Sequence, residues 1–289
     1  MPTAAAFPAR QSWFPLLERG LAEDIGPGDA TSDSVLPAGA RLNCQLEARE
    51  DLIVCGLAVA EAAFCLVDPS VRFERRCADG EAVGKGFVLA RIAGDARGVL
   101  AAERTALNFM QRMCGIATET RRYVDAVAGT GTQIVDTRKT LPGWRALDKY
   151  AVRVGGGENH RIGLFDAVLI KDNHIAAAGG VVEAIRAARA GVPPHLWLQV
   201  EVESMDQAEA AVAEGVDSLL LDNRSVPELA RFVQSYGARC TLEASGGVTF
   251  ERIAEIAATG VHRISIGALT HSVRAADVAL EVQPSGAGA

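Results

Sequence analysis

Apolar runs of strand length alternate with amphipathic, helix-like stretches from about Gln133 onward. The runs occupy residues 133–137, 166–171, 196–203, 217–222, 239–245 and 262–267. Spacings of about twenty residues between the later runs are short enough for single βα units. Such alternation is typical of a parallel sheet with crossover helices. Six units are fewer than the eight of a complete barrel, so we expect an incomplete, slightly open, TIM-like α/β barrel of about six strands.

A doubly wound open sheet is the alternative architecture for this half of the chain. It is disfavoured because no G-x-G-x-x-G motif follows the first predicted strand.

The first 110 residues have a different pattern. RLNCQLEAREDLIVCG (41–56) and VRFERRCADGEAV (71–83) alternate apolar and polar positions, as half-buried antiparallel strands do, and GLAVAEAAFCLV (56–67) between them is helix-like. A long helical stretch over 98–129 links the two parts. We therefore expect an N-terminal α/β sandwich domain with an antiparallel sheet (1–112), a barrel domain (113–275), and a C-terminal segment with a loose tail (276–289).

Composition narrows the class of protein. The chain has 289 residues, 49% hydrophobic, and a net charge of −7. It is therefore predicted to be globular, and no basic face suggests nucleic-acid binding. The first residues contain no apolar stretch of signal-peptide quality, and no apolar run approaches the length that a membrane span needs. None of the six cysteines forms a C-x-x-C pair. These features predict a cytoplasmic protein with reduced cysteines.

The candidate chemistry lies where the predicted strands end. Parallel strands place their ligands at their carboxyl ends, so a closed sheet would gather these residues at one mouth. In chain order they are Arg138 and Lys139, Lys171, Glu201 and Glu203, Asp222, Ser245-Gly246-Gly247, and Gly267. Any one of these residues alone is consistent with an ordinary solvated loop, but six polar or glycine strand ends in succession favour a site.

Positive charge is concentrated in one stretch of this acidic chain. Residues 136–174 carry a surplus of two positive charges although the whole chain is negative. Arginine and lysine bind carboxylates and phosphates, so this stretch predicts an anionic ligand. Salt bridges to the nearby acids are the competing interpretation.

Several residues keep more than one interpretation at this stage. Lys171 follows a buried-looking run, where a desolvated lysine forms a Schiff base and a protonated one binds an anion. Glu201 and Asp222 are suited to orient sugar hydroxyls, hold Mg²⁺ or neutralise Lys171. His160 is suited to act as a general acid or base, as an anion donor or as a structural donor. Ser245-Gly246-Gly247 precedes a helix expected near Thr249, where backbone N–H groups close on a phosphate.

Several long motifs are distributed along the chain. They are EDIGPGDAT (23–31), AERTALNFMQRMCGIAT (102–118), DTRKTLPGWR (136–145), GGGENHRIGLFDAVLIKDNHI (155–175), EVE (201–203), LLLDN (219–223), LEASGG (242–247) and SIGALTHS (265–272). Together they resemble the quinolinate phosphoribosyltransferase family, also called carboxylating nicotinate-nucleotide pyrophosphorylase, over nearly the whole chain. Two residues depart from the family pattern: Leu141 stands where threonine is expected, and Cys114 where serine is expected.

The resemblance implies an activity. Quinolinate and 5-phosphoribosyl-1-pyrophosphate would give nicotinate mononucleotide, pyrophosphate and CO₂, with Mg²⁺, in de novo NAD biosynthesis. It also implies a homodimer, or a hexamer built as a trimer of dimers, in which Arg104 completes the neighbouring site. Mg²⁺ would bind mainly through the substrate pyrophosphate, with Glu201 and Asp222 as further candidate ligands.

The resemblance also assigns roles to individual residues. The implied catalytic residues are Lys139, Lys171, Glu201 and Asp222. The implied substrate-binding residues are Arg104, Thr137, Arg138, Lys139, His160, Arg161, Lys171, Glu201, Asp222, Ser245, Gly246, Gly247, Ile266, Gly267 and Ala268.

Three other functions compete with this one. A related phosphoribosyltransferase of the same fold would act on another pyridine or base. An aldolase would form a Schiff base on Lys171. A non-catalytic protein would only bind an anion, which is disfavoured because cations, acids and a phosphate loop together exceed what binding requires.

Overall fold

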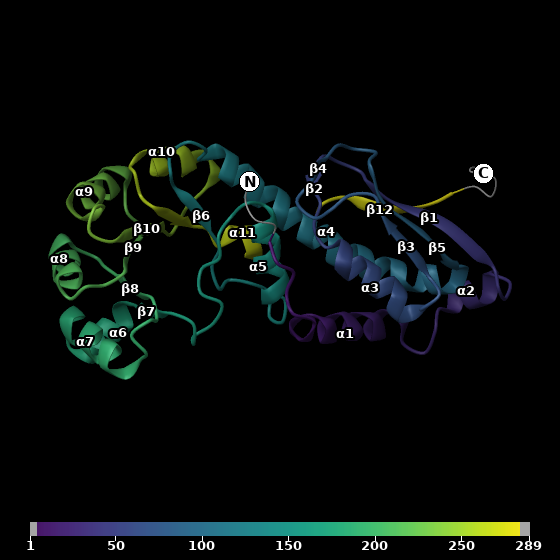
Figure 1. The fold of residues 1–289 in the computed structure, drawn as a ribbon, viewed down its shortest axis with the longest axis horizontal. Helices are drawn as coiled ribbons and strands as arrows, with labels where there is room; N and C mark the ends of the chain where they lie inside the picture. Colours follow the sequence, from purple (N-terminus) through teal and green to yellow (C-terminus); the bar gives the residue numbers. More distant parts are fainter. Residues whose placement is uncertain (1–4, 284–289) are drawn as a thin grey trace. The chain divides into compact units, whose positions relative to one another are not determined.

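The computed structural model describes residues 5–283, which form two compact units (Figure 1). The first unit comprises the described residues up to Arg121, together with Thr140–Gly156 and those from Thr270 onward. The second unit comprises Arg122–Lys139 and Gly157–Leu269. The domain boundaries expected from the sequence, at residues 112 and 275, remain a prediction.

The first unit is built around a four-stranded antiparallel sheet with the strand order β12-β1-β5-β3, and a two-stranded ribbon, β2-β4, accompanies it. Cys44, Leu46 and Ala48 alternate with less buried residues along β1, as the sequence predicted. The strands are β1 (Arg41–Ala48), β2 (Leu52–Ile53), β3 (Arg72–Arg75), β4 (Ala82–Val83), β5 (Val88–Asp95) and β12 (Val278–Val282).

Helices complete the first unit and bury large apolar side chains such as Phe64, Leu17 and Met110. The predicted helix near residues 56–67 is α3, and the predicted long helix is α4, which runs on into the second unit. The elements are the 3₁₀ turn η1 (Arg10–Ser12), α1 (Phe14–Ile25), α2 (Ala30–Val35), α3 (Leu57–Val67), α4 (Ala96–Ala126), α5 (Arg145–Val154) and α11 (Ala268–His271), which straddles the two units.

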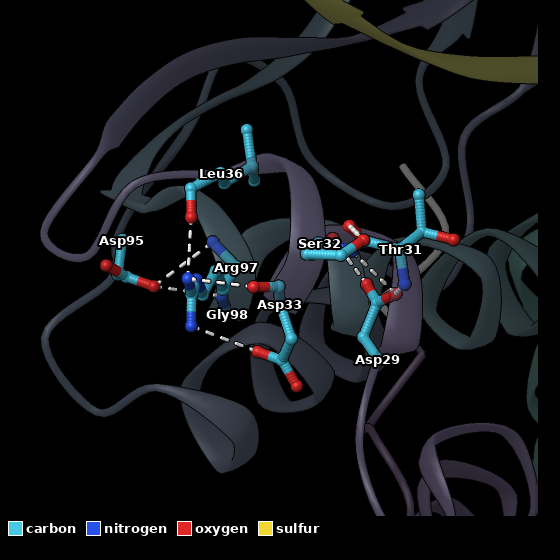
Figure 2. A network of polar contacts seen from close by, with 9 residues as sticks. Asp29, Thr31, Ser32, Asp33, Leu36, Asp95, Arg97 and Gly98 are labelled. Carbon is cyan, nitrogen blue, oxygen red and sulfur yellow. Dashed lines mark hydrogen bonds and ion pairs between the residues drawn. The ribbon is translucent and has the colours of Figure 1, made fainter.

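Polar contacts fix the short helix α2 at both of its ends. At its amino end, the carboxylate of Asp29 accepts hydrogen bonds from the backbone N–H groups of Thr31 and Ser32, at 3.1 and 3.0 Å (Figure 2). At its carboxyl end, Arg97 donates to the carbonyl of Leu36 at 2.6 Å and to the carboxylate of Asp33 at 3.1 Å. Six residues form a marginal helix on their own, so these partners are what order α2.

The second unit contains a six-stranded parallel sheet with the order β6-β11-β10-β9-β8-β7. Its outermost strands, β6 and β7, are not paired with each other, so the incomplete barrel that the sequence predicted is confirmed. The strands are β6 (Gln133–Val135), β7 (Val168–Ile170), β8 (Leu198–Glu201), β9 (Ser218–Asp222), β10 (Thr241–Ser245) and β11 (Arg263–Ser265).

Helices follow the strands in turn, and Figure 1 shows α8, α9 and α10 on the outer side of the curved sheet. They cover it with one apolar face each: α9, for example, buries Leu229, Phe232 and Tyr236. The elements are α6 (Asp172–Ala178), α7 (Val181–Gly191), α8 (Met205–Ala213), α9 (Val226–Tyr236), the 3₁₀ turn η2 (Phe250–Arg252) and α10 (Ile253–Ala258).

Two expectations about the environment of the chain can be compared with the structure. No helix within residues 5–283 combines the length and the apolar character that a membrane span requires. The six cysteines are free thiols, and burial raises the pKa of Cys114 to about 12 and that of Cys44 to about 11. Such thiols are unreactive and pack as small apolar groups.

Candidate active site

Most of the residues singled out in the sequence lie at one edge of the parallel sheet. Glu201, Asp222 and Ser245 are the last residues of β8, β9 and β10. Strand register aligns these ends: Asp222 is opposite Ser245, and Glu201 is opposite Leu220. The remaining members follow β6, β7, β10 and β11 directly and are Thr137, Arg138, Lys139, Lys171, Gly246, Gly247, Ile266, Gly267 and Ala268.

An ion pair joins the ends of β7 and β8. Nζ of Lys171 lies 2.9 Å from Oε2 of Glu201. The side chain of Lys171 is 49% exposed, whereas that of Glu201 is 16% exposed. The buried-looking run before Lys171 therefore does not desolvate its side chain, because this run is β7, a three-residue strand at the edge of the sheet. An exposed ammonium group beside a carboxylate is suited to bind an anion.

His174 orders the chain next to this pair. Its Nδ1 accepts a hydrogen bond of 3.0 Å from the backbone N–H of Lys171. In return, the backbone N–H of His174 donates to the carbonyl of Lys171 at 2.8 Å. These reciprocal contacts set the direction in which the lysine leaves the strand.

The end of β9 is held by an asparagine in an unusual conformation. Asn223 has a φ of 54°, and it is the one non-glycine residue with positive φ in the part of the chain that the structure describes. Its side-chain amide donates to Oδ2 of Asp222 at 2.6 Å, and its backbone N–H donates to the carbonyl of Ser245 at 2.8 Å. Backbone strain of this kind is concentrated at functional sites, where surrounding contacts maintain it.

A glycine turn follows β10 and packs on that asparagine. Gly246 and Gly247 have φ values of 80° and 56°. A Cβ atom added to Gly246 would lie 2.4 Å from Oδ1 of Asn223, so only glycine fits there. The next helix begins as the 3₁₀ turn η2 at Phe250, and α10 has only six residues. The backbone N–H groups of the turn, rather than a long helix, are therefore the candidate phosphate donors.

Two guanidinium groups approach each other near the end of β6. Burial lowers the pKa of Arg161 below its usual value, and the positive charge of Arg138 lowers it further. Asp166 opposes this effect but does not cancel it. A carboxylate or phosphate near both guanidinium groups would oppose this effect on Arg161, so the pair is a candidate anion site.

The segment that carries His160 and Arg161 spans from β6 toward β7. Glu158 forms a parallel bridge with Val135 of β6. The backbone N–H of His160 donates to Oδ1 of Asp136 at 2.8 Å, and its ring lies 2.9 Å from the side-chain amide of Gln199. Farther along, Arg161 donates to the carbonyl of Ala167 at 3.1 Å. This segment therefore lies along the open seam of the barrel.

A cavity of about 340 Å³ adjoins this segment. His160 and Arg161 line it together with Trp197 and Arg263, which stand at the amino ends of β8 and β11. The guanidinium of Arg263 lies 5.1 Å from the centre of the Trp197 ring, within cation–π range. His160 and Arg161 thus line a cavity that reaches the amino ends of strands, whereas the other predicted site residues lie at the carboxyl ends.

Arg104 lies in the first unit, on an exposed position of α4. The other predicted site residues, Thr137 to Ala268, all belong to the second unit. The role predicted for Arg104 in a neighbouring subunit's site remains a prediction.

The acids at the strand ends do not form a metal site by themselves. Among residues 5–283, no cluster of three or more histidine, cysteine, aspartate or glutamate side chains is arranged to hold a metal ion. Glu201 is engaged by Lys171, and Asp222 by Asn223. Among the described residues these two acids therefore do not by themselves make up a ligand set for a resident ion.

Four residues of this region had no predicted role. His174 and Asn223 order the backbone at the ends of β7 and β9, and nothing in a single sequence distinguishes them from loop residues. Gln199 and Glu243 are 2% and 1% exposed inside the barrel. The sequence offered one indication of a role for Gln199 and Glu243: each is a polar residue within an otherwise apolar run.

Comparison with known proteins covers both halves of the chain. The models named "Quinolinate phosphoribosyl transferase, N-terminal domain" and "Quinolinate phosphoribosyl transferase, C-terminal domain" match residues 29–114 and 116–281. The chain is 46% identical over 275 residues to the nicotinate-nucleotide pyrophosphorylase (carboxylating) of Mycobacterium leprae. The matched region covers 92% of this chain and 95% of that protein.

Two further relatives carry the same enzyme name. The probable nicotinate-nucleotide pyrophosphorylase (carboxylating) of Bacillus subtilis is 42% identical over 269 residues and 92% of each chain. The solved structure of the nicotinate-nucleotide pyrophosphorylase from Francisella tularensis superposes with a TM-score of 0.93 at 37% identity, covering 98% of this chain and 100% of that one. Since two domain models together match most of the chain, this protein belongs to the quinolinate phosphoribosyl transferase family.

Proposed function

We propose that this enzyme transfers the phosphoribosyl group of 5-phosphoribosyl-1-pyrophosphate to quinolinate, giving nicotinate mononucleotide, pyrophosphate and CO₂. One observation carries the proposal. In a chain of this family, cations, carboxylates and a glycine turn converge at the carboxyl ends of neighbouring parallel strands. Each of these three groups matches one part of the two substrates.

The cations suit the dicarboxylate and the pyrophosphate. Quinolinate carries two negative charges, and the positive charge of Arg138 reaches Arg161 and lowers its pKa, so the two guanidinium groups lie close enough to share an anion. A bidentate guanidinium pairs well with a carboxylate. Mobile charges for the departing pyrophosphate come from Lys171 and Lys139. Lys139 is exposed beyond the end of β6. Magnesium enters as part of the ribosyl donor, bound to its pyrophosphate.

The acids and the glycine turn suit the sugar phosphate. Loss of pyrophosphate leaves positive charge on the sugar carbon, which the carboxylates of Glu201 and Asp222 stabilise from fixed positions. The same carboxylates accept hydrogen bonds from ribose hydroxyl groups. The backbone N–H groups of residues 245–247 and 266–268 receive the 5-phosphate. The pyridine nitrogen then becomes positive, so the ring holds the electron pair left when the adjacent carboxylate departs as CO₂.

The proposed role of Arg104 requires more than one subunit. The enzyme assembles as a dimer, or as a hexamer of three dimers, and Arg104 from one subunit completes the anion site of its neighbour. Its support is the resemblance of the motif around Arg104 to the family pattern, and its exposed position on α4 leaves the guanidinium accessible.

The experiment is a product analysis with purified enzyme. Quinolinate labelled in the carboxylate next to the nitrogen is supplied with the ribosyl donor and Mg²⁺, and nicotinate is supplied in a parallel reaction. Stoichiometric release of labelled CO₂, pyrophosphate and nicotinate mononucleotide is the expected result. Efficient use of nicotinate without CO₂ release would replace the proposal by a related transferase. A borohydride-trapped adduct on Lys171 would instead support an aldolase.

A further inference from the structure

A cluster of polar side chains is buried inside the barrel below the strand ends. Gln199 of β8, Ser218 of β9 and Glu243 of β10 are at most 2% exposed. Buried polar groups are costly unless each finds a partner, so their mutual contacts determine how they are oriented. The function proposed above does not use any of these three residues directly.

The contacts define the orientation of the Gln199 amide. Nε2 of Gln199 lies 3.1 Å from Oε2 of Glu243 and 3.2 Å from Oγ of Ser218. A carboxylate only accepts hydrogen bonds, so the NH₂ group of the amide must face Glu243. The amide oxygen of Gln199 therefore faces Nε2 of His160, at 2.9 Å.

This orientation determines which ring nitrogen of His160 carries the proton. The amide oxygen is an acceptor, so Nε2 of His160 must be the N–H donor. Nδ1 accepts a hydrogen bond of 2.8 Å from the backbone N–H of Arg161, which leaves no room for a second proton there. Both ring nitrogens are thus engaged by the protein, and the hydrogen-bond pattern corresponds to the tautomer with its proton on Nε2.

Glu243 reinforces this arrangement through its second oxygen. Oε1 lies 3.5 Å from Nε2 of His160, and among the described residues it has no hydrogen-bond partner. A negative oxygen at this distance attracts the same N–H group that Gln199 accepts from. The carboxylate therefore acts on His160 both directly and through the amide.

We propose that Gln199 and Glu243 are positioning residues for substrate binding, which rests on the function proposed above. They hold His160 as a single tautomer and so anchor the segment from Glu158 to Arg161 across the open seam. The guanidinium of Arg161 is thereby kept in place for a carboxylate of the substrate. His160 acts here as an anchor and not as the proton carrier of the reaction.

The first test needs no substrate. The chain has five histidines, so the ring nitrogens can be resolved by ¹⁵N NMR, with His160→Gln used only for assignment. In the wild-type enzyme at neutral pH, His160 is expected as the neutral Nε2–H tautomer. An imidazolium or an Nδ1–H ring would overturn the proposal whatever the variants do.

The second test compares two neighbours of the same amide. In Glu243→Gln the new carboxamide can donate to the oxygen of Gln199. The Gln199 amide can then flip so that its NH₂ group faces His160, and a second His160 tautomer appears. In Ser218→Ala the carboxylate still orients Gln199, and the ring signals stay those of the wild type. Indistinguishable spectra for the two variants would also overturn the proposal.

Kinetics give the third readout. For Glu243→Gln the KM for quinolinate rises about five- to tenfold, since an ordering contact of Arg161 is weakened, while the KM for the ribosyl donor changes less than about twofold. Equal effects on both KM values would indicate a general structural role and overturn the proposal. If the wild type does not turn over quinolinate, the proposed function fails, and the NMR result still decides the tautomer.

Discussion

At the scale of single residues, the charge of Lys171 contributes little to folding. The ion pair between Lys171 and Glu201 is half open to solvent on the lysine side. Exposed ion pairs contribute less than about 1 kcal/mol to stability, because water screens them and two long side chains lose freedom. The ammonium group is therefore available to an anionic ligand at little cost to the fold.

Replacing Lys171 should impair catalysis without unfolding the enzyme. In Lys171→Ala the kcat/KM for quinolinate is expected to fall about a hundredfold, because one cation of the pyrophosphate site is removed. Lys85→Ala is a matched control, since that lysine is exposed in the first unit. Wild-type turnover in Lys171→Ala would remove this residue from the site.

Asn223 allows conformation and hydrogen bonding to be separated. Asn223→Gly keeps the positive φ without strain but removes the contact to Asp222, so kcat/KM should fall about five- to tenfold with little change in stability. Asn223→Ala should lose about 1 kcal/mol of unfolding free energy in addition, because its Cβ disfavours the left-handed conformation. Urea unfolding and steady-state kinetics measure the two effects, and equal stability of the two variants would contradict the argument.

At the scale of elements, capping decides whether short helices form. The helix α2 depends on the side chain of Asp29, and hydrogen bonds from the Ser32 side chain and backbone hold the pKa of Asp29 below its usual value of 3.8. A lowered acid pKa means that the stabilisation is present above pH 3.8. It is lost as the pH falls through the lower, folded-state value.

This dependence gives a thermal prediction. Asp29→Ala should lower the Tm near neutral pH by about 2–4 °C, through the lost cap. The difference should shrink as the pH falls below 3.8, where the wild type loses its own cap. Asp29→Asn keeps a capping oxygen that does not titrate, so it serves as the control. A Tm difference that grows in acid would be inconsistent with this account.

The elements also show what the sequence could and could not predict. The strand ends were predictable because each apolar run stops at a polar residue, and parallel strands share one carboxyl edge. The contacts of Gln199 and Glu243 were not, because they join β8 and β10 across 44 residues of chain. The conformation of Asn223 was hidden for another reason: φ depends on the neighbouring turn, and asparagine is common in ordinary loops.

The pairing of strands far apart in the sequence could not be predicted either. The segment from residue 276 was expected as a C-terminal segment with a loose tail, yet Val278–Val282 forms β12 and pairs with β1 at the opposite end of the sequence. No local pattern marks a partner more than 200 residues away. The QPSGAGA tail itself lies largely outside the described residues, since only Gln283 is described.

At the scale of the whole molecule, activity would depend on the assembled dimer if Arg104 of one subunit completes the site of the other. Mixing Arg104→Ala subunits with Lys171→Ala subunits should restore activity, because one site of each mixed dimer then contains no substitution. Random reassortment should recover about a quarter of the wild-type activity. Each variant mixed with itself is the control. No recovery, with mixed dimers verified by mass spectrometry, would show that each site is built from one chain.

The seam of the barrel has a further consequence. Its two outermost strands share no ladder, and the segment from Glu158 to Arg161 lies between them, bridged to β6 through its backbone and to Ala167, next to β7, through Arg161. Because no ladder joins β6 to β7 directly, the distance between these strands can change without breaking the ladder that holds either of them in the sheet. Changes along this seam therefore alter the interior at low cost to the scaffold, which makes it a natural place for evolution to exchange one planar ring for another.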